Sequence, residues 1–182
     1  MLTLRILKTD LHIGFGFLLV TAVSFLEPNG ITGTCLFFCF VHELGHLLAM
    51  KLTGAEVTGI RLYGGGIGIS ADTEELSKPA RLLIYSAGCL TNFAFALLLR
   101  DPINLAIALF NLMPVSYFDG GMILRLLLPN SEKPLEIVSG ATICLLILAF
   151  FASALSTQAE ISLSQIVTLF VIVASELIDR EV

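Results

Sequence analysis

Long apolar segments are the feature that most restricts how this chain can fold. About six can be marked, over residues 11–26, 31–53, 78–99, 103–128, 135–155 and 161–178. Apolar segments of this length are typical of helices that cross a bilayer. Only 14% of the 182 residues are charged, whereas a soluble domain of this size has about a quarter. The sequence therefore predicts an all-α polytopic membrane protein with about six transmembrane helices, and one domain over residues 1–182.

The first apolar segment follows Arg5 and Lys8 and could be mistaken for a signal peptide. No small-residue cleavage site follows it, and residues 27–30 (Glu-Pro-Asn-Gly) are typical of a tight external turn. We expect it to be a retained span.

The basic residues orient the predicted spans. With the N-terminus inside, all of the 10 Lys and Arg residues except Arg100 lie at or near cytoplasmic ends: Arg5, Lys8, Lys51, Arg61, Lys78, Arg81, Arg125, Lys133 and Arg180. This agrees with the positive-inside rule. The sequence predicts a multi-pass integral membrane protein with both termini in the cytoplasm. No basic tract indicates nucleic acid, so none is expected as a partner.

Residues 42–46 read His-Glu-Leu-Gly-His within the second apolar segment. Two histidines four residues apart lie on the same helix face, so His42 and His46 can bind one metal ion. Glu43 is placed to take a proton from a water that the metal activates. Lys51 follows His46 by five residues, or roughly 7–8 Å along a helix, which places the site in the cytoplasmic half of the membrane. Ionisable residues inside a membrane are costly and usually functional.

A third ligand is expected at Asp119, inside the fourth apolar segment. Pro114 cannot continue the helical hydrogen bonds, so the helix should kink or break just before the aspartate. Gly120 and Gly121 allow an irregular backbone there. The alternatives for Asp119 are a helix end at a water-filled vestibule or an ion pair with Arg125.

The other polar and sulfur-containing residues of the spans carry weaker signals. The cysteines are Cys35, Cys39, Cys89 and Cys144. Their spacing fits no zinc module and no disulfide-stapled fold. Cys39 precedes His42 by three residues and could be an auxiliary ligand, although small buried apolar residues are the default for free cysteine. His12 matches no motif and is expected at the membrane interface.

The segment 57–70 joins the second and third spans, and its apolar residues alternate around Gly64, Gly65 and Gly66. This pattern favours a β-hairpin over a helix. An exposed hairpin edge beside the metal could hold a substrate by strand addition, which makes the three glycines candidate substrate-binding residues. A flexible Gly-rich connector is the alternative.

Three motifs together resemble one family. They are residues 42–46; N-x-x-P-x-x-x-x-D-G from Asn111 to Gly120; and residues 86–92, Ser-Ala-Gly-Cys-Leu-Thr-Asn. The chain resembles the site-2 protease family of intramembrane zinc metalloproteases over a catalytic core of about residues 31–128. Since no PDZ-like insertion is seen, it is most similar to the branch typified by stage IV sporulation protein FB. Members of that branch commonly carry a further cytoplasmic domain after the last span, whereas this sequence stops at Val182.

The resemblance implies an activity and roles for particular residues. It implies one Zn²⁺ per chain, bound by His42, His46 and Asp119, with Glu43 as the catalytic base. Asn111 matches the asparagine that steadies the substrate carbonyl, and Asn92 could do similar work. Either asparagine could instead make an interhelical hydrogen bond. The implied membrane-dipping hairpin coincides with segment 57–70.

The implied partners are a membrane protein substrate, the lipid bilayer and a regulatory membrane protein. Small size and resemblance point to a prokaryotic cell membrane.

Two positions depart from the family pattern. Cys89 and Ser116 stand where the family often has proline. Neither position is a ligand in the family, so the metal site is retained, while the helix break and the substrate path could differ. Two other functions stay open: a metal-ion transporter, since broken helices with acidic residues also suit ion pathways, and a catalytically silent homologue that binds membrane proteins.

Overall fold

The structure is a computed structural model, and it describes residues 2–6, 9–26, 29–63, 66–128 and 132–157. The elements in chain order are β1 (Leu2–Ile6), β2 (Thr9–Ile13), α1 (Phe15–Ser24), α2 (Ile31–Thr53), β3 (Glu56–Tyr63), β4 (Gly66–Asp72), α3 (Lys78–Leu99), α4 (Pro102–Asn111), α5 (Asp119–Leu127) and α6 (Glu132–Thr157). The predicted sixth span, residues 161–178, lies outside the described residues.

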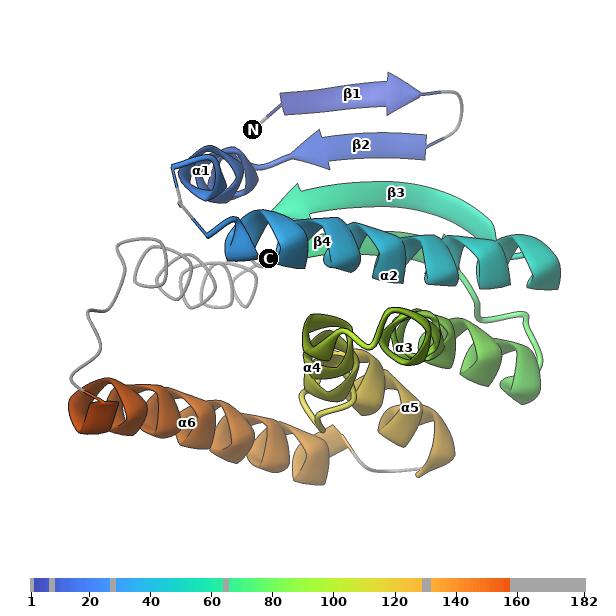
Figure 1. Cartoon of the computed structure of the whole chain (residues 1–182). Helices are drawn as coiled ribbons and strands as arrows, with labels where there is room; N and C mark the ends of the chain where they lie inside the picture. Colours follow the sequence, from blue (N-terminus) through green and yellow to red (C-terminus); the bar gives the residue numbers. More distant parts are fainter. Residues whose placement is uncertain (1, 7–8, 27–28, 64–65, 129–131, 158–182) are drawn as a thin grey trace.

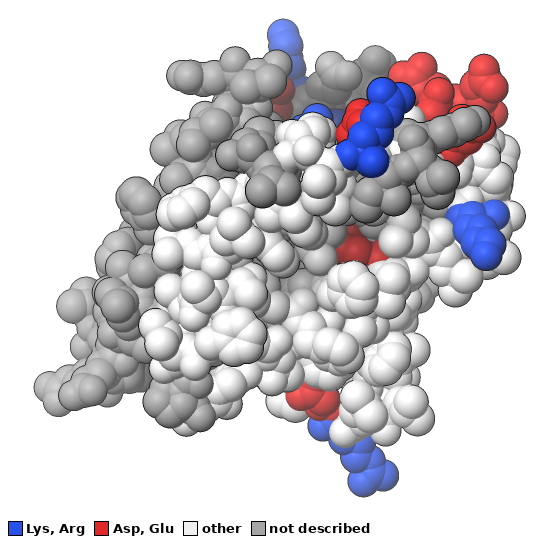
Figure 2. Space-filling view, turned by 90° about the horizontal axis from the view of Figure 1, so that it is seen from above, with Lys and Arg blue, Asp and Glu red and all other residues white. Residues whose placement is uncertain are grey.

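Two long apolar helices, α2 and α3, form the centre of the molecule. Their bounds coincide with the second and third predicted spans. Within the described part of the chain, these are the helices long and apolar enough to cross a bilayer by length and composition. Only 33% and 22% of their most apolar windows are buried, whereas the core helix of a soluble protein is mostly buried. On the face in Figure 2, charged residues lie mainly near the edges, and uncharged residues fill most of the area between.

The described chain is mostly helical, as predicted, but its β-structure is a four-stranded sheet and not only a hairpin over residues 57–70. The strand order is β1-β2-β3-β4; β1 and β2 pair antiparallel, β2 and β3 parallel, and β3 and β4 antiparallel. The two N-terminal strands were not predicted, and β2 takes up the first residues of the supposed first span. The helix that follows, α1, has 10 residues, or roughly 15 Å, so it cannot cross the hydrocarbon core alone.

The sheet packs against α2 through its β3–β4 half (Figure 1). A small core of Ala49 and Met50 from α2 and Ile84 from α3 lies there, and all three are buried. Val57, Ile69 and Ala71 from the two strands pack against this core. The contact fixes β4 beside the face of α2 that carries the two histidines.

The fourth apolar segment is not one helix. It divides into α4 and α5, joined by an irregular turn over residues 112–118. Asp101 caps the start of α4, because its carboxylate accepts hydrogen bonds from the backbone N–H groups of Ile103 (3.2 Å) and Asn104 (3.3 Å). Pro114 lies inside the turn, as expected for a residue that cannot continue a helix. The predicted break before Asp119 is confirmed, and Asp119 becomes the first residue of α5.

Candidate active site

The two histidines of α2 point the same way because they are one helical turn apart. Their Nε2 atoms lie 3.1 Å from each other. His42 is 3% exposed and His46 is 8% exposed. Burying two imidazoles side by side is costly unless their polar atoms have partners.

A backbone carbonyl fixes the orientation of His46. Its Nδ1 lies 2.7 Å from the carbonyl oxygen of Ile84 on α3. Since a carbonyl oxygen can only accept, Nδ1 carries the proton and donates it to Ile84. In a neutral imidazole the other nitrogen is then an acceptor. The Nε2 lone pair of His46 is therefore free to face His42 and Asp119.

A glycine lets α3 approach the two rings closely. A Cβ added at Gly88 would collide with the Nε2 atoms of both His42 and His46. Gly88 is buried, one helical turn beyond Ile84. The position requires glycine because the imidazoles occupy the space that any side chain would need.

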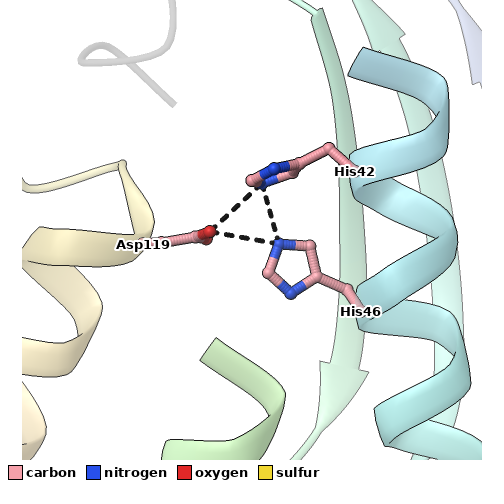
Figure 3. Close-up of side chains that lie close together, drawn as sticks. All are labelled: His42, His46 and Asp119. Atoms are coloured by element: carbon pink, nitrogen blue, oxygen red, sulfur yellow. Dashed lines mark hydrogen bonds and ion pairs between the residues drawn. The ribbon is translucent and has the colours of Figure 1, made fainter. Parts of the chain in front are cut away.

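Asp119 reaches the histidines from the opposite side, at the start of α5 (Figure 3). Its Oδ2 lies 3.1 Å from Nε2 of His42 and 3.3 Å from Nε2 of His46. The start of α5 packs directly on the preceding turn: a Cβ at Gly121 would overlap the carbonyl group of Val115. This close packing sets the position from which Asp119 points at the site.

These three side chains fit a zinc ion. The donor atoms of His42, His46 and Asp119 all lie within 4.8 Å of one another, and they form a group that could hold a metal among the described residues. In a tetrahedral site with bonds of about 2.0–2.1 Å, neighbouring donors lie about 3.3–3.4 Å apart, close to the distances found here. With His46 neutral, its Nε2 lone pair and an Asp119 carboxylate oxygen face each other, an arrangement that a bound cation stabilises.

A cavity of about 1240 Å³ opens beside the three side chains. Glu43, one residue after His42, lines it together with Asn111 at the end of α4. His46 and Asp119 line the same cavity as Glu43. Gly66 also lines the cavity, at the first position of β4. Gly64 and Gly65 lie outside the described residues.

Asn111 and Asn92 differ in their surroundings. The side-chain nitrogen of Asn111 donates to the Ile107 carbonyl at 3.0 Å and has a second N–H available. Asn92 is fully buried and does not line the cavity. Neither polar atom of its amide has a hydrogen-bond partner among the described residues.

The ion pairs of Asp119 within the described part of the chain are those with the two histidines, and none joins it to Arg125. Arg125 instead lines the cavity. His12 lies on β2, where it pairs with Thr3 and Arg61 in register, so it is part of the sheet.

Two contacts of the site were not anticipated. Cys89 Sγ lies 3.2 Å from Asp119 Oδ2. The Ser139 hydroxyl of α6 accepts a hydrogen bond of 3.1 Å from the backbone N–H of Ser116 in the turn. The sequence signal for Cys89 was its place in the motif over residues 86–92, where the family often has proline; Ser139 carried none.

The sequence profile of the family described as Peptidase M50B-like matches residues 15–179, nearly all of the chain. The chain belongs to this family. This M50B-like peptidase is therefore a metalloprotease of the site-2 protease family, whose members are integral membrane proteins. Peptidases of the M50 family use zinc, and His42, His46 and Asp119 lie close enough together for a metal site.

A solved structure supports the same fold. The site-2 protease from Methanocaldococcus jannaschii is similar to this M50B-like peptidase with a TM-score of 0.66 and 23% sequence identity. The alignment covers 97% of this chain and 94% of that one. At this identity the similarity shows a shared fold. No curated protein matches the sequence significantly.

Proposed function

We propose that this chain is an intramembrane zinc protease that hydrolyses peptide bonds in or near the transmembrane segments of membrane-bound substrates. The observation that carries the proposal is the convergence of His42, His46 and Asp119 beside a cavity that Glu43 also lines. The site lies on apolar helices, which suits a substrate that is itself in the membrane.

In this proposal His42, His46 and Asp119 bind one zinc ion per chain. Three protein ligands leave a fourth position open, as in catalytic rather than structural zinc sites. When bound, zinc supplies Lewis acidity, which makes water nucleophilic near neutral pH and polarises a carbonyl. The Ile84 carbonyl keeps His46 in the tautomer that offers Nε2 to the metal.

Glu43 is the proposed general base. It takes a proton from the attacking water and delivers it to the leaving amine. Its place on the cavity wall, one residue after a ligand, supports this role. A carboxylate in this setting has no other evident function, since no ion pair involving Glu43 occurs among the residues described.

Asn111 is proposed to donate its second side-chain N–H to the substrate carbonyl as negative charge develops. If so, Asn111→Ala lowers kcat by about 10²-fold and leaves zinc content unchanged. An unchanged kcat in a reconstituted cleavage assay contradicts this role. For Asn92 we favour interhelical packing, because the side chain is buried away from the cavity.

Substrate binding is proposed along β4. Gly66 lines the cavity, and β4 is the edge strand of the sheet, so an unwound substrate could pair with it. A hairpin of β3 and β4 that dips into the membrane is part of this proposal. Pairing of β3 with β4 supports this arrangement.

Membrane topology is proposed from the charges: six apolar segments in the membrane, both termini in the cytoplasm of a prokaryotic cell, and the site in the cytoplasmic half. The chain then acts as one domain, with its catalytic core at about residues 31–128. A regulatory membrane protein remains a proposed partner, and the branch of stage IV sporulation protein FB remains a prediction.

The decisive experiment measures the metal content of detergent-purified protein by elemental mass spectrometry, for wild type and Asp119→Ala. We expect about one zinc per wild-type chain and a clear reduction in the variant. A folded wild type without zinc would overturn the metal site and favour a silent homologue. Zinc unaffected by the substitution would require a different third ligand.

The second experiment separates a protease from a transporter. Glu43→Gln should retain zinc and lose cleavage of a membrane-protein substrate, because the amide cannot accept the proton. Full cleavage by the variant would refute the assignment of the base. Zinc flux in proteoliposomes that persists in the variant would favour transport.

A further inference from the structure

Cys89 is the one thiol in contact with the candidate metal ligands among the described residues. It lies on α3 immediately after Gly88 and is 2% exposed. Its Sγ is 3.2 Å from Oδ2 of Asp119, the same oxygen that faces both histidines. The thiol therefore reaches the carboxylate from α3, behind the metal-binding face.

The thiol proton has two acceptors within reach, and the carboxylate is favoured. The alternative is the Ala108 carbonyl oxygen, at 3.7 Å. That oxygen already accepts a hydrogen bond from the backbone N–H of Leu112 at 3.1 Å. Asp119 is closer and charged, and hydrogen bonds to ionised acceptors are the stronger ones. Cys89 thus donates to Asp119.

The geometry excludes Cys89 as a fourth ligand. The donor group within 4.8 Å contains His42, His46 and Asp119 but not the Cys89 sulfur. The thiol also does not line the cavity, so it faces neither the open coordination position nor the substrate. Cys89 therefore contacts a proposed metal ligand but is not a ligand itself.

Within the described part of the chain, the Asp119 carboxylate has three side-chain partners, which are the two histidines and Cys89. In a loaded site the Nε2 atoms of both histidines would bind the metal, so neither would offer a hydrogen bond to the carboxylate. Ligating carboxylates depend on such outer hydrogen bonds for their orientation.

We propose that Cys89 is a positioning residue that holds the carboxylate of Asp119 in the orientation needed to bind the metal. This inference rests on the proposed zinc site. The S–H group donates one hydrogen bond to Oδ2 and stays protonated. No bond is made or broken during catalysis at this residue.

The first test compares zinc affinity by chelator competition in Cys89→Ala and Cys89→Ser. Loss of an outer hydrogen bond lowers metal affinity by about 10–100-fold, and a thiol is a weak donor, so we expect about a tenfold loss in Cys89→Ala. Serine keeps a donor and should recover much of that loss. The control is Cys144→Ala, which removes an exposed thiol on α6 and should bind zinc like wild type.

The second test observes the hydrogen bond directly and needs no metal. Subtracting the infrared spectrum of Cys89→Ala from that of wild type identifies the S–H stretching band of Cys89. Subtracting the spectrum of Cys144→Ala identifies the band of Cys144. We expect the Cys89 band to lie at lower frequency than the Cys144 band. In Asp119→Ala, the Cys89 band should move toward the frequency of a thiol that donates no hydrogen bond.

The two tests separate failure of this inference from failure of the proposed function. If the Cys89 band has the same frequency in Asp119→Ala as in wild type, the proposed hydrogen bond is refuted, whatever the zinc content. Equal zinc affinity in wild type and Cys89→Ala overturns the positioning role while the zinc site stands. A Cys89→Ser variant as weak as Cys89→Ala assigns the effect to packing and also refutes the proposal. Wild type without zinc, but with the shifted band, contradicts the proposed function alone.

Discussion

The two halves of the candidate metal site are built differently. The histidine half consists of His42 and His46 on α2, a helix of 23 residues packed on α3. Both rings are buried, and α3 fixes them through the Ile84 carbonyl and the bare backbone at Gly88. The elements that carry and orient these ligands are continuous helices.

The aspartate half consists of Asp119, the turn over residues 112–118 and α5, a helix of only 9 residues. The Asp119 side chain is 16% exposed. The position of Asp119 depends on the close packing of Gly121 against the Val115 carbonyl group. It also depends on the Ser139 hydroxyl, which accepts a hydrogen bond from the backbone N–H of Ser116 in the turn. The supports of this half come from several separate segments.

The comparison teaches where each half is vulnerable. At Gly88 in the histidine half, an added Cβ meets the two imidazole rings, so it displaces side chains and leaves the helices in place. In the aspartate half, an added atom displaces backbone, because the nearest neighbours are backbone carbonyls. Substitutions should therefore separate metal binding from stability in the first half and couple the two in the second.

The largest effect is expected for Gly88→Ala. The added Cβ collides with both Nε2 atoms, so the rings must rotate away and zinc affinity should fall by roughly 100-fold or more. Alanine is favoured over glycine in a helix by about 1 kcal/mol, so the thermal stability of the variant in detergent should not drop below that of metal-free wild type. Zinc affinity equal to that of wild type would contradict the assigned role of α3.

Gly121→Ala should produce an intermediate effect that combines both losses. The Cβ overlaps the Val115 carbonyl group, and overpacking of this kind costs about 1–3 kcal/mol. Because Asp119 moves with α5, zinc affinity should fall by about tenfold. Thermal unfolding and chelator competition on the same sample test the coupling.

The matched control for both glycine substitutions is Gly33→Ala on α2, where an added Cβ meets nothing within 4 Å. It should leave both stability and zinc affinity unchanged or slightly improved. If Gly121→Ala lowered zinc affinity with no loss of stability, the proposed difference between the two halves would be wrong.

Ser139→Ala should have the smallest effect. It leaves the backbone N–H of Ser116 without its acceptor, at a cost of about 1 kcal/mol. Thr142→Ala on the same helix is the control, because Thr142 bonds only to the Val138 carbonyl of its own helix. Equal unfolding temperatures for the two variants would show that α6 does not support the turn.

Removal of the metal sharpens the same comparison. Bound zinc stabilises the folded protein because the ion binds the native site and not the dispersed ligands. Chelation should lower the unfolding temperature of wild type and change that of Gly88→Ala much less, since the latter has little zinc to lose. An equal decrease in both would indicate a metal site elsewhere.

Much of the helical framework could be predicted from sequence. The bounds of α2 and α3 followed from apolar run length, and the break before Asp119 followed from Pro114. The strands β1 and β2 were missed although a signal was present. Apolar residues alternate with polar ones in both strands, as Leu2, Leu4 and Ile6 do around Thr3 and Arg5. The longer apolar run over residues 11–26 concealed this period of two.

The sequence by itself determined the histidine pair, because four residues along a helix bring two side chains to one face regardless of the rest of the fold. It also determined that the fourth apolar segment breaks near Asp119. The sequence also predicted Asp119 as the third ligand, but tertiary structure alone decided how its carboxylate meets those histidines, that Cys89 donates to it, and that Asn92 does not line the cavity. These facts depend on how α3, α5 and the turn pack together, and such contacts between distant segments leave no periodic pattern in a single sequence.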